Sequence, residues 1–236
     1  MQTQDIEYQI NGRKFVGYLA DGSNGKKTAG VLVAHEGGGM TGHPKERARM
    51  LAELGYVAFA MDTFGEAIES REQAMAVITS LSNDLATLRN RANTALELLK
   101  AQPNVDRMRT AAIGFCFGGT TVLELARSGA DVKGVATFHG NLSTKMPAQK
   151  GALKAPILAM NGADDKFIPH EQIHGFYDEM RAAGADWQFV NFGGAVHCFA
   201  EPDEHNAVPG CNFNAAAYKR SVFLMHGFFN EAFAKK

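Results

Sequence analysis

The chain has 236 residues, 45% of them hydrophobic and 21% charged, with a formal net charge of −1, which is an ordinary globular composition for one domain over residues 1–236. It lacks the surplus of positive charge that attracts nucleic acid or an anionic membrane. No apolar run reaches the ~18 residues of a membrane-spanning helix, and the first residues lack the basic and then apolar regions of a secretory signal.

The first predicted elements form a hairpin followed by two buried strands. Apolar residues alternate in places over residues 6–20, and Asn11-Gly12 lies between two short runs, as in a two-residue hairpin turn. Residues 30–34 and 56–61 are apolar runs without alternation, which is typical of strands buried on both faces. Between them, residues 44–54 have helical spacing, and a glycine closes that helix.

Helices and strands alternate through the rest of the chain. Residues 66–100 are mostly helix formers, with a break near residues 82–84, where an N-cap is available. The further strands are expected at 110–113, 132–138, 156–160 and 187–192, and the further helices at about 117–128, 170–183 and 213–233. This alternation predicts parallel βαβ units in one doubly wound, mostly parallel sheet that opens with an antiparallel hairpin.

The segment between the strand at 110–113 and the next helix has the form Gly-x-Cys-x-Gly, a nucleophile elbow with Cys116 where serine usually stands. An elbow requires small residues two before and two after the nucleophile, because the strand-to-helix turn is too tight for side chains there. The turn holds the nucleophile at a helix N-terminus, where the dipole favours an anion, so we expect the thiol to ionise readily. Alternatively, Cys116 is a small apolar residue in a glycine-rich strand end.

Two later strand ends carry an acid and a histidine. Asp164 and Asp165 follow one strand, and His197 follows the next. Reactive groups in such a sheet lie at the carboxyl ends of strands, so these side chains can converge on Cys116. Nucleophile, acid and histidine in this order are the α/β-hydrolase order. His197 would keep the sulfur as thiolate and protonate the leaving group, and a carboxylate would orient the imidazole.

The choice between the two aspartates rests on spacing. The pattern Gly-x-x-Asp-x-x-Ile-Pro over residues 162–169 resembles the acid loop of α/β-hydrolases and selects Asp165. Asp164 then becomes a turn or capping residue, which is the ordinary role of an aspartate in such a loop.

A glycine-rich loop after the strand at 30–34 resembles the one that supplies an oxyanion hole. The two backbone N–H donors would come from Gly37 and from Phe117, the residue after the nucleophile. A phosphate-binding loop is the alternative, but the segment lacks the Lys-Ser/Thr of a P-loop and the spacing of a dinucleotide fingerprint.

Taken together, these residues resemble the dienelactone hydrolase family of α/β-hydrolases, from about residue 30 to the end. The most specific match is Gly-Phe-Cys-Phe-Gly-Gly at 114–119, with cysteine in place of serine. The resemblance implies the α/β-hydrolase fold and a triad of Cys116, Asp165 and His197. It also implies that Glu36 matches the family glutamate beside the thiol, which takes the thiol proton when substrate arrives. As a bare residue, Glu36 is equally a solvated loop acid; its predicted place is beside the thiol, as an activator or as part of the substrate pocket.

One departure from the family concerns the substrate. Shortly after the His-x-Phe-Ala segment the family carries an arginine that helps to bind the substrate carboxylate, and here Glu201 stands in that place. A like charge would repel an anionic lactone acid, which argues against dienelactone itself. Arg71, Arg89 or Arg91 can offer a cation to the pocket, although arginines on helices usually lie on a solvated face.

The remaining cysteines and histidines predict no cofactor. Three cysteines, Cys116, Cys198 and Cys211, are an odd and sparse set, which argues against a disulfide framework and favours a reducing cytoplasm. We expect Cys198 to be a packing residue and Cys211 a loop thiol. The histidines outside the triad, His35, His139 and His205 among them, lack metal-ligand spacing, so neither a metal nor a cofactor is expected.

The sequence therefore predicts a cytoplasmic cysteine hydrolase, a monomer or small homo-oligomer, that cleaves a small ester, lactone or thioester through an acyl-enzyme. The alternative is a binding or redox-sensing protein that uses the Cys116 thiolate on a hydrolase scaffold. A sensor needs the thiolate but not an oriented general base, so the pairing of His197 with Asp165 favours the enzyme.

Overall fold

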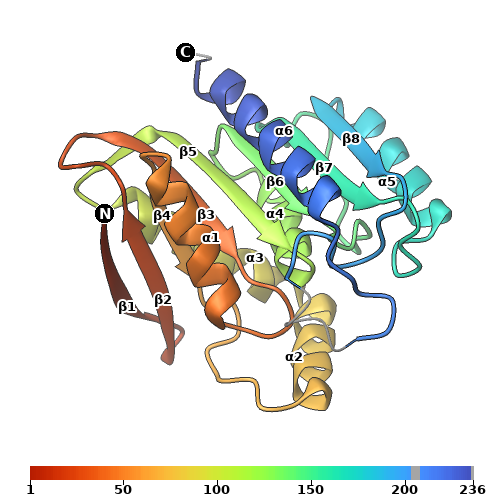
Figure 1. The fold of residues 1–236 in the computed structure, drawn as a ribbon, viewed down its shortest axis with the longest axis horizontal. Coiled ribbons are helices and arrows are strands. Elements are labelled where there is room, and N and C mark those ends of the chain that lie inside the picture. The colour runs from red at the N-terminus through yellow and green to blue at the C-terminus, as the bar shows by residue number, and fades with distance from the viewer. Residues whose placement is uncertain (203–207, 235–236) are drawn as a thin grey trace.

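The computed structural model describes residues 1–202 and 208–234, and these residues contain an eight-stranded sheet (Figure 1). Its strands are β1 (Gln2–Ile10), β2 (Arg13–Asp21), β3 (Thr28–Ala34), β4 (Val57–Met61), β5 (Val105–Phe115), β6 (Gly134–Phe138), β7 (Ile157–Gly162) and β8 (Trp187–Phe192). They lie in the order β1-β2-β4-β3-β5-β6-β7-β8. From β4 to β8 all pairs are parallel, whereas β2 pairs antiparallel with both β1 and β4. The predicted sheet, with its N-terminal hairpin, is confirmed.

The hairpin turn has the chemistry that its sequence indicated. Asn11 and Gly12 both have positive φ, 51° and 78°, as a two-residue turn between twisted strands requires. The turn sets the register in which Ile10 faces Arg13, and this register places Tyr8, Ile10 and Phe15 in the core.

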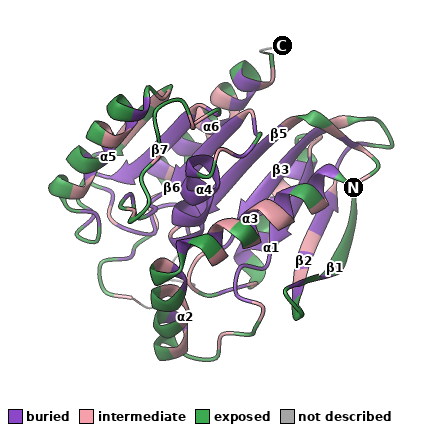
Figure 2. Ribbon diagram, turned by 180° about the vertical axis from the view of Figure 1, so that it is seen from behind, coloured by how far each residue is buried: buried purple, intermediate pink, exposed green. Residues whose placement is uncertain are grey.

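Helices cover both faces of the sheet (Figures 1 and 2). On one face lie α1 (Gly42–Glu53) and α6 (Ala215–Ala234), and on the other lie α3 (Leu85–Lys100), α4 (Phe117–Arg127) and α5 (His170–Ala183). The side chains of β3 supply both cores in alternation: Val31 and Val33 pack with α1 and α6, whereas Leu32 packs with the opposite helices. Because both faces are covered, the buried parts of the central strands are mostly apolar, as their sequences predicted.

One further helix, α2 (Arg71–Asn83), lies beyond the carboxyl ends of the parallel strands (Figure 1). The predicted break in the long helical stretch is confirmed at Asp84, which ends α2 and caps α3 by accepting a hydrogen bond from the N–H of Thr87 at 3.0 Å. A small apolar cluster that includes Phe64, Leu88 and Phe117 packs α2 and α3 against the end of the sheet.

Strand β5 is longer than the pattern predicted, because it begins at Val105 rather than near residue 110. Its first residues include charged, partly exposed side chains, so they lack the continuous apolar run of a buried strand. They extend the pairing with β3 across a register shift at Ala29 and Gly30.

An ion network ties the segment after β6 to the helices beneath it. Arg127, with its side chain 1% exposed, is paired with Glu124 at 2.9 Å and with Glu179 at 2.7 Å. The same guanidinium donates to the carbonyl of Leu142 at 2.7 Å. A buried guanidinium needs partners of this kind, and here they hold the loop that forms one wall of the site. Within the described ranges, no helix combines the length and apolarity that crossing a membrane takes.

Candidate active site

Cys116 is the single residue between the end of β5 and the start of α4. Its backbone has φ 50° and ψ −116°, a strained conformation for a residue with a side chain. The glycines on either side make the turn possible, because a Cβ on Gly114 would overlap the carbonyl of Gly118, and one on Gly118 would overlap the carbonyl of Ala34. The structure thus gives this segment the geometry of a nucleophile elbow.

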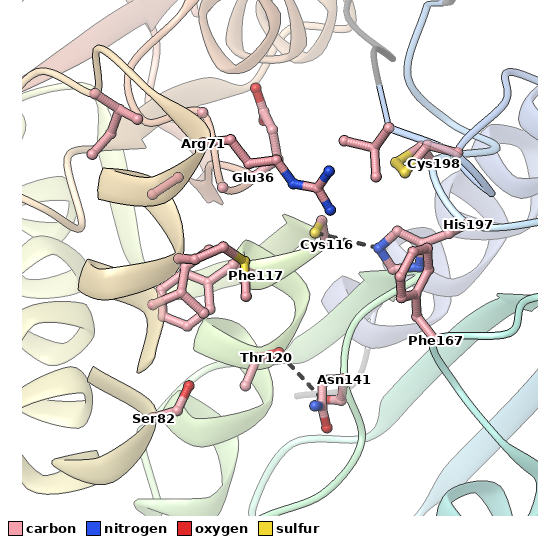
Figure 3. Close-up of a pocket in the computed structure, with 18 of the residues that line it drawn as sticks. Glu36, Arg71, Ser82, Cys116, Phe117, Thr120, Asn141, Phe167, His197 and Cys198 are labelled. Carbon is pink, nitrogen blue, oxygen red and sulfur yellow. Dashed lines mark hydrogen bonds between the residues drawn. A yellow bond between two sulfur atoms is a disulfide. The ribbon is translucent and has the colours of Figure 1, made fainter. Parts of the chain in front are cut away.

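The structure brings Cys116, His197 and Asp165 together, and Figure 3 shows the contact between His197 and Cys116. His197 Nε2 lies 3.3 Å from Cys116 Sγ, and His197 Nδ1 donates to Asp165 Oδ2 at 2.7 Å. The other carboxylate oxygen of Asp165 accepts from the N–H of Phe167 at 2.8 Å. Asp165 is buried, whereas Asp164 is exposed. The three side chains come from the ends of β5, β7 and β8, as the sequence analysis expected of a triad.

The charge on His197 follows from its two partners. Burial opposes a charge on the ring, but the hydrogen bonds to Asp165 and to the sulfur outweigh it and raise the pKa of His197 to about 10. The imidazole is therefore protonated at neutral pH, with one N–H directed to the carboxylate and the other to the sulfur.

Glu36 lies directly after β3 and lines the same cavity. Its Oε1 accepts from Thr41 Oγ1 at 3.0 Å, and its Oε2 lies 3.1 Å from Nδ1 of the buried His43. Burial acts to raise the pKa of Glu36, but the contact with His43 outweighs it and leaves the pKa lowered. The carboxylate is therefore ionised and held on both oxygens. His43 did not emerge from the sequence: it lies seven residues after Glu36, in the first turn of α1, and no motif indicates this contact.

Gly37 and Phe117, the residues predicted to supply the oxyanion donors, both line the cavity that contains Cys116. Phe117 is the first residue of α4, where a backbone N–H has no partner within the helix. Among the described residues, neither N–H donates to a backbone carbonyl outside the regular elements.

The cavity has a volume of about 940 Å³ and two contrasting walls. One wall is largely apolar and includes Ile68, Ala74, Met75, Ile78 and Leu85, from α2, α3 and the segment before α2. A second wall is polar and comes from Thr120 and the loop after β6, with Asn141, Ser143, Thr144 and Lys145. A cavity of this size accommodates a substrate larger than a simple acetate ester.

Of the three arginines that the sequence offered to the pocket, Arg71 is the one that lines it. It begins α2, and Figure 3 shows its guanidinium reaching across the cavity toward Cys116. Arg89 is instead bound to Glu124, and Arg91 donates to the carbonyl of Thr63.

Glu201 is buried at the same cavity, 5% exposed. Burial and the nearby charge of Glu36 raise the pKa of Glu201 to about 8, against a smaller opposing effect of His197. Glu201 is therefore neutral at pH 7. The repulsion of an anionic lactone that the sequence predicted requires a charge at this position, and burial removes that charge.

The other histidines that the sequence analysis considered for a metal have structural partners. His35 Nε2 accepts from the N–H of Thr63 at 3.0 Å, and His139 Nδ1 accepts from the N–H of Cys116 at 3.2 Å. His205 lies outside the described residues. Over residues 1–202 and 208–234, no group of three or more His, Cys, Asp or Glu side chains is arranged to hold a metal ion.

The expectation that the remaining cysteines stay unpaired is corrected, because Cys198 and Cys211 form a disulfide. The segment after β8 and the segment before α6 meet in a short bridge between His197 and Cys211, and the N–H of Asn212 donates to the carbonyl of His197 at 3.0 Å. This pairing brings the two Cα atoms to 4.9 Å, within disulfide range. The two cysteines are 13 positions apart in the sequence, and no local pattern indicates that they meet.

Known proteins share this sequence and this arrangement. The model of the dienelactone hydrolase family matches residues 15–233. An uncharacterized protein of Caenorhabditis elegans is 35% identical over 153 residues, 62% of this chain and 95% of its own length. A protein of Methylorubrum extorquens assigned as a carboxymethylenebutenolidase is 29% identical over 195 residues, 77% of this chain and 67% of its own.

Among solved structures, a dienelactone hydrolase-like promiscuous phosphotriesterase from metagenomic libraries superposes with a TM-score of 0.93. It is 38% identical, and the match covers 98% of both chains. The α/β-hydrolase fold expected from the sequence is thereby confirmed.

The tight turn at the elbow predicts that one added methyl group at Gly118 lowers the stability of the protein. Gly118→Ala should lower the free energy of unfolding by about 2 kcal/mol, because the added Cβ overlaps the carbonyl of Ala34 and forces the elbow apart. Urea unfolding followed by circular dichroism measures this loss. Gly175→Ala is the matched control: it lies in α5 with nothing within 4 Å of the new Cβ, and should stabilise by about 0.5 kcal/mol. Equal stabilities of the two variants would contradict the tight turn.

Proposed function

We propose that this chain, which belongs to the dienelactone hydrolase family and is a hydrolase of ester or lactone bonds, uses Cys116 as its nucleophile and passes through an acyl-enzyme. The observation that carries the proposal is the continuous contact from sulfur to imidazole to carboxylate, at 3.3 Å and 2.7 Å. A protonated His197 beside the sulfur supports a thiolate–imidazolium pair before substrate arrives.

The proposed reaction has two halves. The thiolate of Cys116 attacks the carbonyl carbon, and the N–H groups of Phe117 and Gly37 stabilise the oxyanion. When this intermediate collapses, the C–O bond breaks and His197 gives its Nε2 proton to the leaving alkoxide, which leaves a thioester on Cys116. Neutral His197 then takes a proton from water, and the resulting hydroxide attacks the thioester. Collapse of the second intermediate releases the acid and restores the thiolate and the imidazolium.

Glu36 has two proposed roles, as thiol activator or as part of the substrate pocket, and its contacts support the second. A carboxylate that accepts from Thr41 and contacts His43 is a weak base toward a thiol. His197, whose Nε2 lies 3.3 Å from Cys116 Sγ, is the group placed to exchange a proton with the sulfur, so the proposed reaction does not need Glu36 as the base.

We propose that the substrate is a lactone or ester that carries a carboxylate. Arg71 reaches toward Cys116 from α2 (Figure 3), and Glu201 is neutral at pH 7, so the pocket offers a cation without the repulsion that the sequence suggested. The name of the Methylorubrum relative, carboxymethylenebutenolidase, denotes a lactone with such a group. The apolar wall along α2 would receive the carbon skeleton of the substrate.

A second substrate class follows from the phosphotriesterase name of the structural relative that is 38% identical. A phosphotriester presents an electrophilic phosphorus and a phosphoryl oxygen, which the thiolate and the two N–H donors can meet in the same way. Aryl phosphotriesters therefore belong in the substrate panel beside esters and lactones.

The competing hypothesis is a binding or redox-sensing protein that uses the Cys116 thiolate on a hydrolase scaffold. Sensing would require the sulfur alone. The 2.7 Å contact between His197 and Asp165 supports catalysis instead, because it orients a general base that a sensor has no use for.

Removal of the sulfur tests the nucleophile. Cys116→Ala should abolish turnover of a p-nitrophenyl ester, because the variant lacks the sulfur that forms the proposed thioester, while circular dichroism shows an unchanged fold. Mass spectrometry of the wild type after incubation with a slow ester should detect a transient acyl adduct on Cys116. Undiminished hydrolysis by the variant would refute the proposal, and oxidation of Cys116 without acylation would favour the sensor.

Substitution of Asp165 should lower kcat far more than substitution of its neighbour Asp164. Asp165→Asn should lower kcat by about 100-fold or more, because it removes the negative charge that orients and stabilises the imidazolium of His197. Asp164→Asn, the matched control on the neighbouring exposed residue, should stay within about twofold of wild type. Steady-state kinetics on one ester decides the matter: a loss at Asp164 equal to or larger than that at Asp165 would reverse the choice.

The pH dependence of selectivity tests the anionic substrate. Glu201, with its pKa raised to about 8, is neutral below that pH and negative above it. The kcat/KM of a carboxylate-bearing ester should therefore fall about fivefold relative to its neutral amide analogue between pH 7 and pH 9.

Two variants separate the contribution of the Glu201 charge to this ratio of kcat/KM values from that of the Arg71 charge. Glu201→Gln should make the ratio independent of pH over this range, whereas Arg71→Gln should lower it at both pH values. If the ratio does not change with pH in the wild type, and Arg71→Gln leaves it unaltered, this pocket does not select an anion.

A further inference from the structure

A histidine outside the triad contacts the main chain of the nucleophile. The N–H of Cys116 is shared between two acceptors, the carbonyl of Phe138 at 3.0 Å and Nδ1 of His139 at 3.2 Å. Both acceptors come from the end of β6, the strand next to β5 in the sheet. His139 is fully buried, so this contact forms without competition from solvent.

The contact determines where the proton of His139 lies. A backbone N–H can only donate, so Nδ1 must present its lone pair, and a neutral ring then carries its proton on Nε2. That nitrogen faces Glu201, whose Oε1 lies 3.6 Å away. Burial, together with the charges of His197 and His43, lowers the pKa of His139 well below its ordinary value. The ring therefore stays neutral while His197 is charged.

The backbone at both strand ends needs this support. Cys116 has φ 50° and His139 has φ 42°, and positive φ is unfavourable for residues with side chains. The loop after β6 packs closely against the first turn of α4. A Cβ added to Gly119 would overlap the side chain of Thr137 and lie 2.7 Å from the Cα of Gly140, so there is no space between the two segments. His139 is thereby held beside the elbow.

His139 also contacts the catalytic base. Its ring packs edge-on against His197, with centroids 5.0 Å apart, and against Phe199 at 5.2 Å. One side chain thus touches the main chain of the nucleophile and the ring that must face the sulfur. None of these contacts reaches the cavity, whose lining includes Cys116, His197 and Glu201 but not His139.

We propose that His139 is a positioning residue for the reaction: through its hydrogen bond to the N–H of Cys116 and its contact with the ring of His197, it aligns the sulfur with the imidazole. This inference rests on Cys116 as the proposed nucleophile. His139 acts through the elbow and does not touch substrate.

Two substitutions of His139 separate the contribution of its hydrogen bond from the contribution of its ring. His139→Asn keeps an acceptor, because Asn Oδ1 takes the place of Nδ1, and asparagine tolerates positive φ. His139→Gly also tolerates positive φ but removes the acceptor. Both variants lose the imidazole ring, so the difference between them reports the hydrogen bond to Cys116.

The readouts are the rate of alkylation of Cys116 by iodoacetamide at pH 7, followed by peptide mass spectrometry, and kcat and KM on p-nitrophenyl acetate. We expect about tenfold losses in alkylation rate and kcat for His139→Gly, with KM within twofold of wild type. His139→Asn should recover most of both rates. Wild-type rates in His139→Gly, or equal losses in the two variants, would overturn the proposal.

A measurement on the unmodified protein covers the case in which His139→Gly does not fold. In the ¹⁵N-labelled wild type, the hydrogen bond predicts a scalar coupling between the amide nitrogen of Cys116 and Nδ1 of His139, and an Nε2–H tautomer. An Nδ1–H tautomer would overturn the proposal. These readouts do not require hydrolysis, so a failure of the proposed function, seen as undiminished activity of Cys116→Ala, is distinguished from a failure of the positioning role.

Discussion

The site depends on one steric constraint, the close approach of the first turn of α4 to the ends of β5 and β3. A side chain at Gly114 or Gly118 has no room there, and this closeness lets the chain turn from strand to helix through Cys116 alone. The sulfur is consequently held at a helix N-terminus beyond the central strands. The same approach places Phe117, the first residue of α4, in the lining of the cavity, and it brings His139 after β6 within hydrogen-bonding distance of the elbow.

Three acid–histidine pairs lie around the sulfur, and their surroundings give them different charges: Asp165 with His197, Glu36 with His43, and Glu201 with His139. In the first pair, a 2.7 Å hydrogen bond and the sulfur together hold the imidazole in its charged form. In the second, the acid is ionised because donors meet both carboxylate oxygens. In the third, burial dominates and keeps both partners neutral at pH 7. Only one of the three imidazoles contacts the sulfur, and the surroundings give that one a protonated N–H to donate.

The sequence predicted what depends on local pattern and strand order. The alternation of strands and helices gave the sheet, and the glycines around Cys116 gave the elbow. Acids and histidines at later strand ends pointed to Asp165 and His197, which the structure brings together. What the sequence missed depends on contacts between distant segments. His139 follows the strand beside the nucleophile strand, a position that signals proximity once strand order is known, but its bond to a backbone N–H has no signature. The pairing of Cys198 with Cys211 and the neutral state of Glu201 likewise arise only when the chain folds.

In the proposed function, chemistry and selectivity are carried by different parts of this structure. The triad side chains follow strands of the sheet, whereas the cavity walls come mainly from α2, the loop after β6 and the first residues of α3 and α4. These walls have their own supports: Arg89 donates to the carbonyl of Met146 at 2.6 Å, and Lys145 reaches Asn83 at the end of α2, also at 2.6 Å. The second contact joins the polar wall to the helix that carries Arg71 and the apolar wall. A change in the walls can therefore alter which ester is accepted while the sulfur, imidazole and carboxylate keep their distances. By the same reasoning, substitutions at Arg71 should act on the choice of substrate, and substitutions at His139 on the rate with every substrate.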